Sequence, residues 1–209
     1  MTPAQNLGRF IAEITAGAAT YVGMQVALIY RADRFLRGGD HLSFLEQGFP
    51  AVRFTEAVEN FAHQHQNVRK QDGIQYGDLV EFVDFDYTAR VARTNLASMW
   101  SAANAPATPK NVSISELVGF PAADRSTPPE LITNDSQFCW NTGHDPLVAG
   151  YELVWRPSAN QQWTHSLCVG NVGTITVNLL KDNVQVGVRA VGHDGKKSPA
   201  VFPLPAESC

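Results

Sequence analysis

Histidines and carboxylates gather in one stretch of this sequence, between Asp33 and Asn67. Asp40 and His41 stand side by side, and His63 and His65 follow in a second polar segment. Neutral imidazole nitrogens and carboxylate oxygens are donors that zinc takes in proteins. The stretch therefore has the composition that a metal-dependent hydrolase site needs.

Short apolar runs predict the elements that would position these side chains. The runs from Val26 to Tyr30 and from Pro50 to Phe54 indicate two short strands, the first of them buried. Asp40 is a candidate cap for a short helix over residues 41–47, which Gly48 would end. Side chains that follow the strands of a rigid sheet are well placed to present a metal site.

A long amphipathic helix is predicted to begin after Asp84. Apolar residues recur there at alternating steps of four and three, which is one face of a helix: Phe85, Ala89, Ala92, Leu96, Met99 and Ala103. Arg90, Arg93, Thr94 and Ser101 are expected on the wet face. Strand, helix, strand and long helix together predict an α/β layered domain.

The pattern changes after a small-residue, proline-containing segment at Ala102 to Lys110, which indicates a linker. Beyond it, apolar residues alternate at period two in several short runs, and turn residues separate them. The Asp194-Gly195 pair favours a tight hairpin turn. This predicts an all-β sandwich over residues 108–205, after an α/β part over residues 1–105.

Composition excludes several classes of protein. With 44% hydrophobic and 17% charged residues in a chain of 209, the sequence is that of a packed globular protein. The net charge of −4 and the scattered Lys and Arg residues give no footprint for nucleic acid. No apolar run approaches the roughly 20 residues of a membrane span, and residues 1–10 lack the pattern of a signal peptide. Three cysteines do not decide the compartment.

The second half resembles a fibronectin type III domain. The likeness rests on Trp140, on the strand Tyr151-Glu152-Leu153-Val154-Trp155, and on the ending from Val188 through Asp194-Gly195 to Ser198-Pro199. Domains of this family are spacers or binding modules. Trp140, Trp155 and Tyr151 are expected in the sandwich core, whereas Trp163 is expected in a surface loop or on an edge strand.

The first half resembles the C-terminal portion of the α/β/α catalytic domain of M28-family zinc aminopeptidases. In that family a late histidine completes a two-zinc site, commonly in a His-Thr-x-x-Asp context. His63 lies four residues before Asn67 and matches this spacing, although Gln64 replaces the Thr and Asn67 replaces the Asp. The resemblance therefore implies His63 as a zinc ligand. His65 is the alternative, because side chains at i and i+2 of an extended segment face opposite ways.

The resemblance implies two further roles. Asp40-His41 matches a Gly-Asp-His or Ser-Asp-His segment of the family, in which the Asp lies near the site as a supporting group that orients ligands. An ordinary helix N-cap is an equally good interpretation of Asp40. Arg37, together with Arg34, is a candidate for the substrate entrance, against a solvated role for both.

The family's remaining metal ligands and its general-base Glu come before the matched region. Residues 1–30 contain Glu13 as their only acidic residue and no histidine, so this stretch cannot supply those groups. One histidine holds zinc weakly, since zinc sites use three or four protein ligands. We therefore expect no catalytic residue in this chain, and an isolated chain that is inactive.

The sequence thus predicts the C-terminal fragment of an M28-type aminopeptidase, in which water activated by two zinc ions hydrolyses N-terminal peptide bonds of a peptide or protein. The resemblance implies a secreted or periplasmic protein. A non-catalytic binding or spacer module, built on the fibronectin-like part, is the alternative. The sequence does not determine the residue preference or the oligomeric state.

Overall fold

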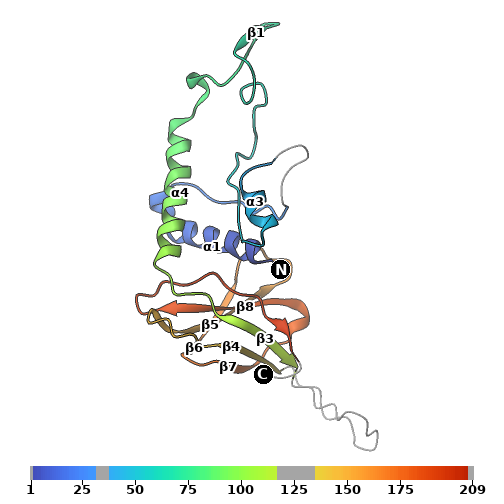
Figure 1. The fold of residues 1–209 in the computed structure, drawn as a ribbon, viewed down its shortest axis with the longest axis vertical. Helices are drawn as coiled ribbons and strands as arrows, with labels where there is room; N and C mark the ends of the chain where they lie inside the picture. Colours follow the sequence, from blue (N-terminus) through green and yellow to red (C-terminus); the bar gives the residue numbers. More distant parts are fainter. Residues whose placement is uncertain (1, 32–37, 117–134, 207–209) are drawn as a thin grey trace, which may run out of the picture.

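The computed structural model describes residues 2–31, 38–116 and 135–206. They form two parts that lie one above the other, a helical part (residues 2–103) and a β-sandwich (residues 110–206) (Figure 1). The helical part consists of α1 (Pro3–Gly17), α2 (Ala19–Val22), α3 (His41–Glu46), β1 (Arg69–Gln71), β2 (Ile74–Tyr76), the 3-10 turn η1 (Val80–Phe82) and α4 (Phe85–Ala103).

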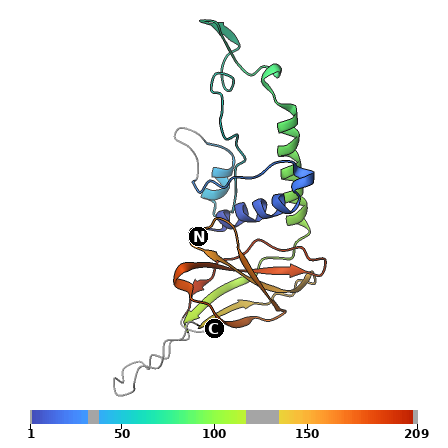
Figure 2. The same ribbon diagram turned by 180° about the vertical axis from the view of Figure 1, so that it is seen from behind.

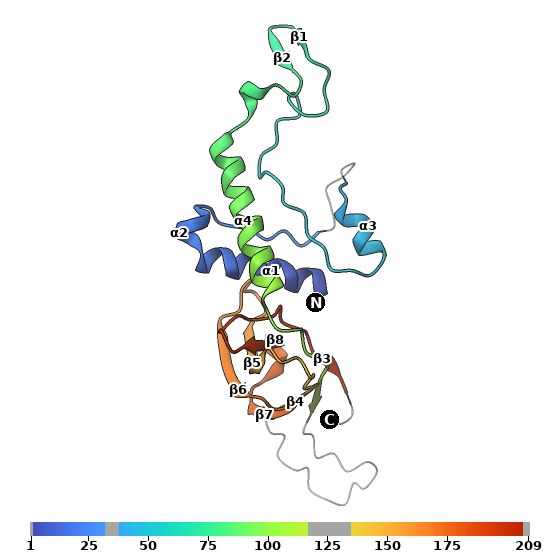
Figure 3. The same cartoon turned by 60° about the vertical axis from the view of Figure 1, so that its left-hand side comes forward.

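α1 and α4 cross next to the sandwich, and β1 and β2 lie at the end of the molecule farthest from it (Figures 1 and 2). We call residues 60–83 the arm, because this segment with its small β1–β2 hairpin extends beyond the helices (Figure 3). The N-terminus of α1 is well defined: Thr2 and Gln5 form a capping box, with Pro3 in the first turn.

The prediction of two strands is wrong in this structure. The segments Val26 to Tyr30 and Pro50 to Phe54 both lie outside any helix or strand. A strand exists only when a neighbour pairs with its N–H and C=O groups. Among the described residues of the helical part, the only strand pairing is that between β1 and β2. The apolar composition of the two segments is real, but no neighbouring strand among the described residues pairs with them.

The short helix that Asp40 was predicted to cap does form as α3, and Gly48 follows its end at φ +80°. The predicted capping bond is wrong, because the Asp40 side chain makes no hydrogen bond to the helix. Asp40 has helical φ and ψ of −59° and −25°, whereas a capping residue needs extended angles. The N–H of Leu42 is instead bonded to the Gly39 carbonyl at 3.0 Å.

α4 forms over the predicted residues, and Asp84 caps it by accepting from the Tyr87 N–H at 2.9 Å. Its predicted orientation is wrong. Thr94 and Ser98 are buried, with 0% and 6% exposure, while Leu96 and Met99 of the predicted apolar face are exposed. Thr94 and Ser98 donate to helix carbonyls four residues back, so their hydroxyls are satisfied within the helix. Small side chains of this kind let helices approach closely.

The sandwich has two sheets, in the strand orders β7-β4-β3-β9 and β6-β5-β8. The elements are β3 (Lys110–Glu116), β4 (Asp135–Asn141), β5 (Val148–Pro157), β6 (His165–Gly170), β7 (Thr174–Asn178), the 3-10 turn η2 (Lys181–Asn183), β8 (Val184–Gly192) and β9 (Leu204–Pro205). All pairs are antiparallel except β3 with β9. The predicted Asp194-Gly195 turn is confirmed, with Gly195 at φ +78° and Val191 bridged to Lys197.

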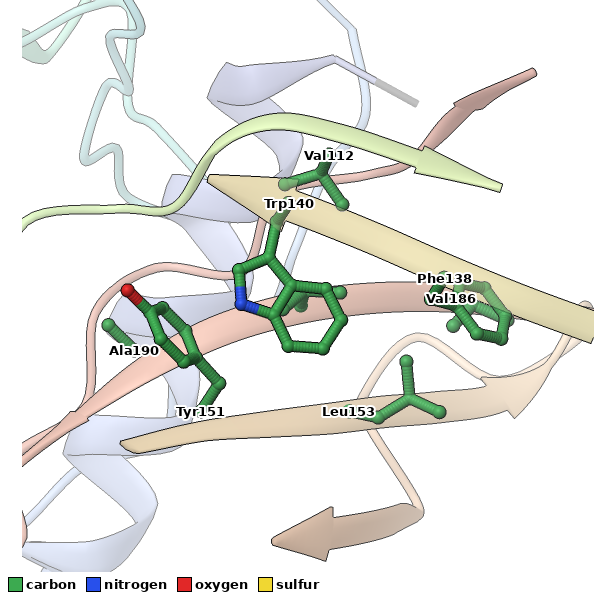
Figure 4. Close-up of a cluster of buried hydrophobic side chains, with 8 residues drawn as sticks. Val112, Phe138, Trp140, Tyr151, Leu153, Val186 and Ala190 are labelled. Atoms are coloured by element: carbon green, nitrogen blue, oxygen red, sulfur yellow. The ribbon is translucent and has the colours of Figure 1, made fainter. Parts of the chain in front are cut away.

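The core between the sheets confirms the period-two pattern (Figure 4). Phe138 and Trp140 of β4 meet Tyr151 and Leu153 of β5, and the Trp140 and Tyr151 rings lie 5.5 Å apart. Buried valines and an alanine complete the cluster: Val112, Val186, Val188 and Ala190. An all-β sandwich below a mixed α and β part is the fold class expected from the sequence.

α1 covers the outer face of the β6-β5-β8 sheet, which the sequence did not predict. Glu152, Val154 and Arg189 point away from the core by strand alternation, yet they are buried. Arg189 donates to Glu152 at 2.6 Å and to both carboxylate oxygens of Glu13 on α1, at 2.7 and 2.9 Å. Lys197 also reaches Glu152, at 3.1 Å. Four charges of alternating sign therefore join α1 to the sheet.

A second contact is centred on Arg9 of α1, which is buried. Its Nε donates to the Gln161 carbonyl at 2.9 Å, and its guanidinium lies 5.0 Å from the Tyr30 ring centre and 5.8 Å from that of Trp163. Trp163 was predicted in a loop or on an edge strand, and it lies in the loop between β5 and β6. It also packs on Gly187, where a Cβ would come within 3.2 Å of the indole.

The connection over residues 104–109 contains no helix or strand, as the linker prediction requires, but it is held to the sandwich. Pro106 and Pro109 are buried, and the Ala107 N–H donates to the Asp145 carboxylate at 2.7 Å. Hydrogen bonds that the carboxylate of Asp145 accepts from the Ala107 N–H and, with a smaller effect, from the Leu147 N–H lower the pKa of Asp145. The division into residues 1–105 and 108–205 stays a prediction.

Candidate metal-ligand site

His63 lies in a turn at the base of the arm, and its ring is held by stacking. The imidazole is parallel to the Phe82 ring, with centres 3.6 Å apart and 4° between the planes. Metal ions bind an imidazole nitrogen in the plane of the ring, at its edge. The stacking therefore fixes the plane of the ring.

Asn60 orients the His63 ring within the same turn. Its side-chain nitrogen lies 3.4 Å from His63 Nε2, and its side-chain oxygen accepts from the Ala62 N–H at 3.1 Å. The Asn60 carbonyl accepts from the His63 N–H at 3.1 Å. A metal-binding histidine usually has its second ring nitrogen in a hydrogen bond that fixes its orientation. The Asn60 amide nitrogen is itself a donor, so it faces the lone pair of His63 Nε2 and is not the acceptor that a metal-bound histidine needs at its second ring nitrogen. Sequence reasoning missed the contacts of His63 with both Asn60 and Phe82.

Gly77 joins this turn to the end of the hairpin. Its N–H donates to the Ala62 carbonyl at 3.0 Å, beside His63. Its φ is +107°, and an added Cβ would lie 2.7 Å from Val68 Cα. Only glycine fits this conformation and this approach of two backbones. A Gly that follows a short strand was the signal by which this contact could have been anticipated.

His65, the alternative ligand, is exposed and has φ +53°. The segment from His63 to His65 is a turn followed by a bend, so the argument from an extended segment does not apply here. The described contacts support the turn at His63 more than the one at His65, since a stacked ring and two hydrogen bonds hold the former. Which of the two binds metal stays a prediction.

The structure does not bring the other predicted site residues to His63. Asp40 is exposed and lies just before α3, and the described residues do not bring it together with His63 in a metal-binding group. Arg34 and Arg37 lie outside the described residues. His41, beside Asp40, is buried at the start of α3. The supporting role of Asp40 and the entrance role of Arg37 therefore stay predictions.

The described residues do not form a complete zinc site. Within residues 2–31, 38–116 and 135–206, no three His, Cys, Asp or Glu side chains come together where they could hold a metal ion. Structural zinc sites take four protein ligands and catalytic sites three. The donors on these segments therefore do not fit a zinc ion by themselves, and His63 supplies at most one ligand.

The comparisons with known proteins add evidence from outside the fold. No family model matches the chain. The chain is 52% identical over 204 residues to a protein of Pyrenophora tritici-repentis named probable zinc metalloprotease, which aligns with 98% of this chain and 39% of that protein. Proteins of the same name from Pyricularia oryzae and Phaeosphaeria nodorum are 52% and 44% identical over 209 and 207 residues, each match covering 98% of this chain and 39% of the relative.

The chain thus spans about two fifths of the length of these curated relatives. Among solved structures, the fn3 domain of human collagen alpha-1(XX) chain matches at 21% identity and a TM-score of 0.34, covering 50% of this chain and 88% of that domain. An Fn3-like protein from Clostridium thermocellum matches at 17% identity and a TM-score of 0.31, covering 49% of this chain and 93% of that one.

The chain is similar to part of proteins named probable zinc metalloprotease, and its described residues form a β-sandwich below a helical part. No described helix has both the length and the apolar character needed to cross a bilayer.

Proposed function

We propose that this chain is part of a zinc-dependent aminopeptidase of the M28 type. The observation that carries the proposal is the identity of about one half to proteins named probable zinc metalloprotease, along nearly the whole chain. Such identity extends through the arm and α4 as well as the sandwich, because the match covers 98% of the chain. The aminopeptidase assignment rests on the M28 resemblance of the segment around His63.

The proposed reaction is hydrolysis of the first peptide bond of a peptide or protein. The oxygen of water adds to the carbonyl carbon, the C–N bond breaks, and the leaving nitrogen takes the proton. Zinc ions, two in the complete enzyme, would supply a Lewis acid and would lower the pKa of a bound water; of the described residues, His63 would hold one of them. The contribution of this chain is to hold one imidazole, that of His63, in a fixed plane by stacking on Phe82.

The chain by itself is proposed to be inactive. The general base and the other ligands are assigned to the part of the relatives that this chain does not span. We expect weak zinc binding and no turnover from the 209 residues, because one histidine cannot replace a set of three or four ligands.

The test uses a chimeric protein in which the unmatched part of the Pyrenophora relative is joined ahead of this chain. The chimera should release the N-terminal residue of a free peptide, and it should not act on the same peptide with an acetylated N-terminus. His63→Ala should abolish turnover, whereas His65→Ala is the matched control and should retain it. Turnover by the unextended chain, or full activity of the His63→Ala chimera, would refute the proposal.

The proposed compartment is secreted or periplasmic. It follows from the resemblance, and the disulfide bond of Cys139 supports it, since disulfides persist mainly in oxidising compartments. Cys168 is a free thiol. Fractionation of the native protein from culture medium and cells is the direct measurement, and a protein confined to the cytosol would contradict this assignment.

The alternative function, a binding or spacer module, has less support from the geometry. α1 is joined to the sandwich by the buried Arg9 and by the Glu13–Arg189 contact. These contacts favour an accessory part with a fixed position.

A further inference from the structure

α4 carries its main apolar surface on the outside of the molecule. We call Phe85, Ala89, Ala92, Leu96, Met99 and Ala103 the α4 stripe. Phe85, Leu96 and Met99 are 66%, 55% and 69% exposed. These residues repeat at steps of four and three along one helix, which is the pattern of a helix face that packs against another element. The stripe is therefore built for a contact that the described residues do not make.

α4 packs on the rest of the helical part with the side opposite to the stripe, which leaves the stripe exposed. α4 packs against α1 and α2, and the side chains buried on it are Thr94 and Ser98. Both are small, and their hydroxyls are bonded within the helix, so this side allows a close helix contact without further partners. α4 thus has a second, more apolar side than the one it uses.

An open apolar groove adjoins the stripe where α1, α2 and α4 meet. Ile14, Tyr21, Leu96 and Trp100 line it, and Trp100 is 65% exposed. Leu96 belongs to both the stripe and the groove. The two features therefore form one continuous surface on one side of the helical part, and large contiguous apolar surfaces mark sites of protein contact.

We propose that the α4 stripe and the adjoining groove are the docking surface for the part of the relatives that this chain does not span. Each alignment covers 98% of this chain but only 39% of the relative. About three fifths of each relative is therefore unmatched, and this unmatched part is the proposed occupant. In a relative that part is joined to the matched region, so its local concentration at the stripe is far above that of a second copy. The inference rests on the proposed function, because it makes this surface an internal contact of the enzyme.

The experiment supplies the unmatched part of a relative as a separate chain. The unmatched part of the Pyrenophora tritici-repentis relative is co-expressed with this chain, and their association is measured by sedimentation. We expect a one-to-one complex. Hydroxyl-radical footprinting should show rapid oxidation of Met99 in this chain alone and at least tenfold slower oxidation in the complex.

Leu96→Asp is the test variant, and Leu204→Asp is its matched control on the sandwich, since Leu204 is 68% exposed. Leu96→Asp should weaken association at least tenfold and Leu204→Asp should leave it unchanged. A complex in which Met99 stays fully reactive and Leu96→Asp has no effect would overturn the proposal. So would self-association of this chain through Leu96, which would assign the surface to a second copy.

If the separate part does not fold, the same two variants are compared in the joined chimera by Met99 oxidation and by thermal unfolding. Leu96→Asp should then lower Tm and restore Met99 oxidation, and Leu204→Asp should do neither; equal behaviour of the two variants overturns the proposal. Neither readout needs zinc or turnover. A protected Met99 in a protein without peptidase activity would refute the proposed function alone, and an active chimera with a reactive Met99 would refute the docking surface alone.

Discussion

Arg189 is the residue that ties the helical part to the sandwich most directly. Its guanidinium is buried between Glu152 of β5 and Glu13 of α1. The sequence indicated that β8 alternates, but it gave no sign that the polar side of that strand would be covered. A buried charge was not expected there because period-two reasoning assigns Arg189 to solvent, and only the position of α1 reverses this.

Removal of Arg189 should therefore cost far more than removal of its exposed partner. Arg189→Ala leaves Glu152 buried with one remaining cation, Lys197, and breaking such a buried pair costs about 3–5 kcal/mol. Glu13→Gln keeps most of the contact at a partly exposed site, where an ion pair contributes about 1 kcal/mol or less. Urea unfolding of the two variants measures the difference, and equal losses would show that Arg189 is not buried in the way described.

Glu152 should make stability depend on acid pH. Burial opposes its ionisation, but the charges and hydrogen bonds of Arg189 and Lys197 outweigh burial, so the pKa of Glu152 is lowered. A carboxyl whose pKa is lowered on folding contributes stability above its unfolded pKa and loses it as pH falls through the folded pKa. Thermal unfolding followed from neutral pH down through the ordinary carboxyl range should show a decrease that is smaller in Glu152→Gln. An identical pH profile for both proteins would contradict this.

At the scale of elements, the sequence predicted α4 and the sandwich strands but not how the helix is turned. The apolar repeat from Phe85 to Ala103 is a sound helix signal, and the helix forms. The sequence predicts Thr94 on the wet face, which is wrong in this structure because Thr94 and Ser98 pack inward. The apolar repeat of a helix does not show which side of that helix is buried, because this depends on the segments that pack against it.

The site turn was predicted only in part. The histidine spacing pointed to His63, but no periodicity indicates that Phe82, far along the chain, stacks on it. The contact depends on Gly77, whose backbone passes close to Val68 and bonds to Ala62. Contacts of this kind arise from the path of an irregular segment, which local propensity does not determine.

Gly77→Ala should therefore disturb the arm more than Gly73→Ala. Both glycines have positive φ, +107° and +81°, but nothing lies within 4 Å of a Cβ at Gly73, whereas Val68 Cα would lie 2.7 Å from one at Gly77. Gly73→Ala should cost about 1 kcal/mol from backbone strain, and Gly77→Ala should in addition open the turn. Hydrogen exchange at the backbone amide of residue 77 is the readout, and equal protection of that amide in both variants would argue against the described contact.

At the scale of the whole molecule, we propose that residues 1–105 and 108–205 are two units docked through α1. The connection between them is held by Pro106, Pro109 and the Ala107 bond to Asp145, so it should resist proteases while the units stay docked. Limited proteolysis should cut residues 104–109 faster in Arg189→Ala than in Glu13→Gln. Cleavage spread evenly over residues 110–116 and 135–206 in the parent chain would count against two units.

Two predicted strands do not form among the described residues. Val26 to Tyr30 and Pro50 to Phe54 have the composition of strands, yet strands need neighbours, and the relatives are longer than this chain by more than its own length. The sandwich, by contrast, pairs its strands within the described residues and could be predicted from sequence. The sandwich was predictable because its strands pair with one another within the described residues. The helical part was not, because the two segments predicted as strands have no pairing strand there.

The central claim, that His63 is one ligand of a zinc site completed by the part of the relatives that this chain does not span, is tested most directly by zinc stoichiometry. Metal content is measured after dialysis for the 209-residue chain, for the joined chimera, and for the chimera with His63→Ala or His65→Ala. We predict no retained zinc in the chain alone, two ions in the chimera and in His65→Ala, and fewer than two in His63→Ala. A His63→Ala chimera that retains both ions would contradict the account.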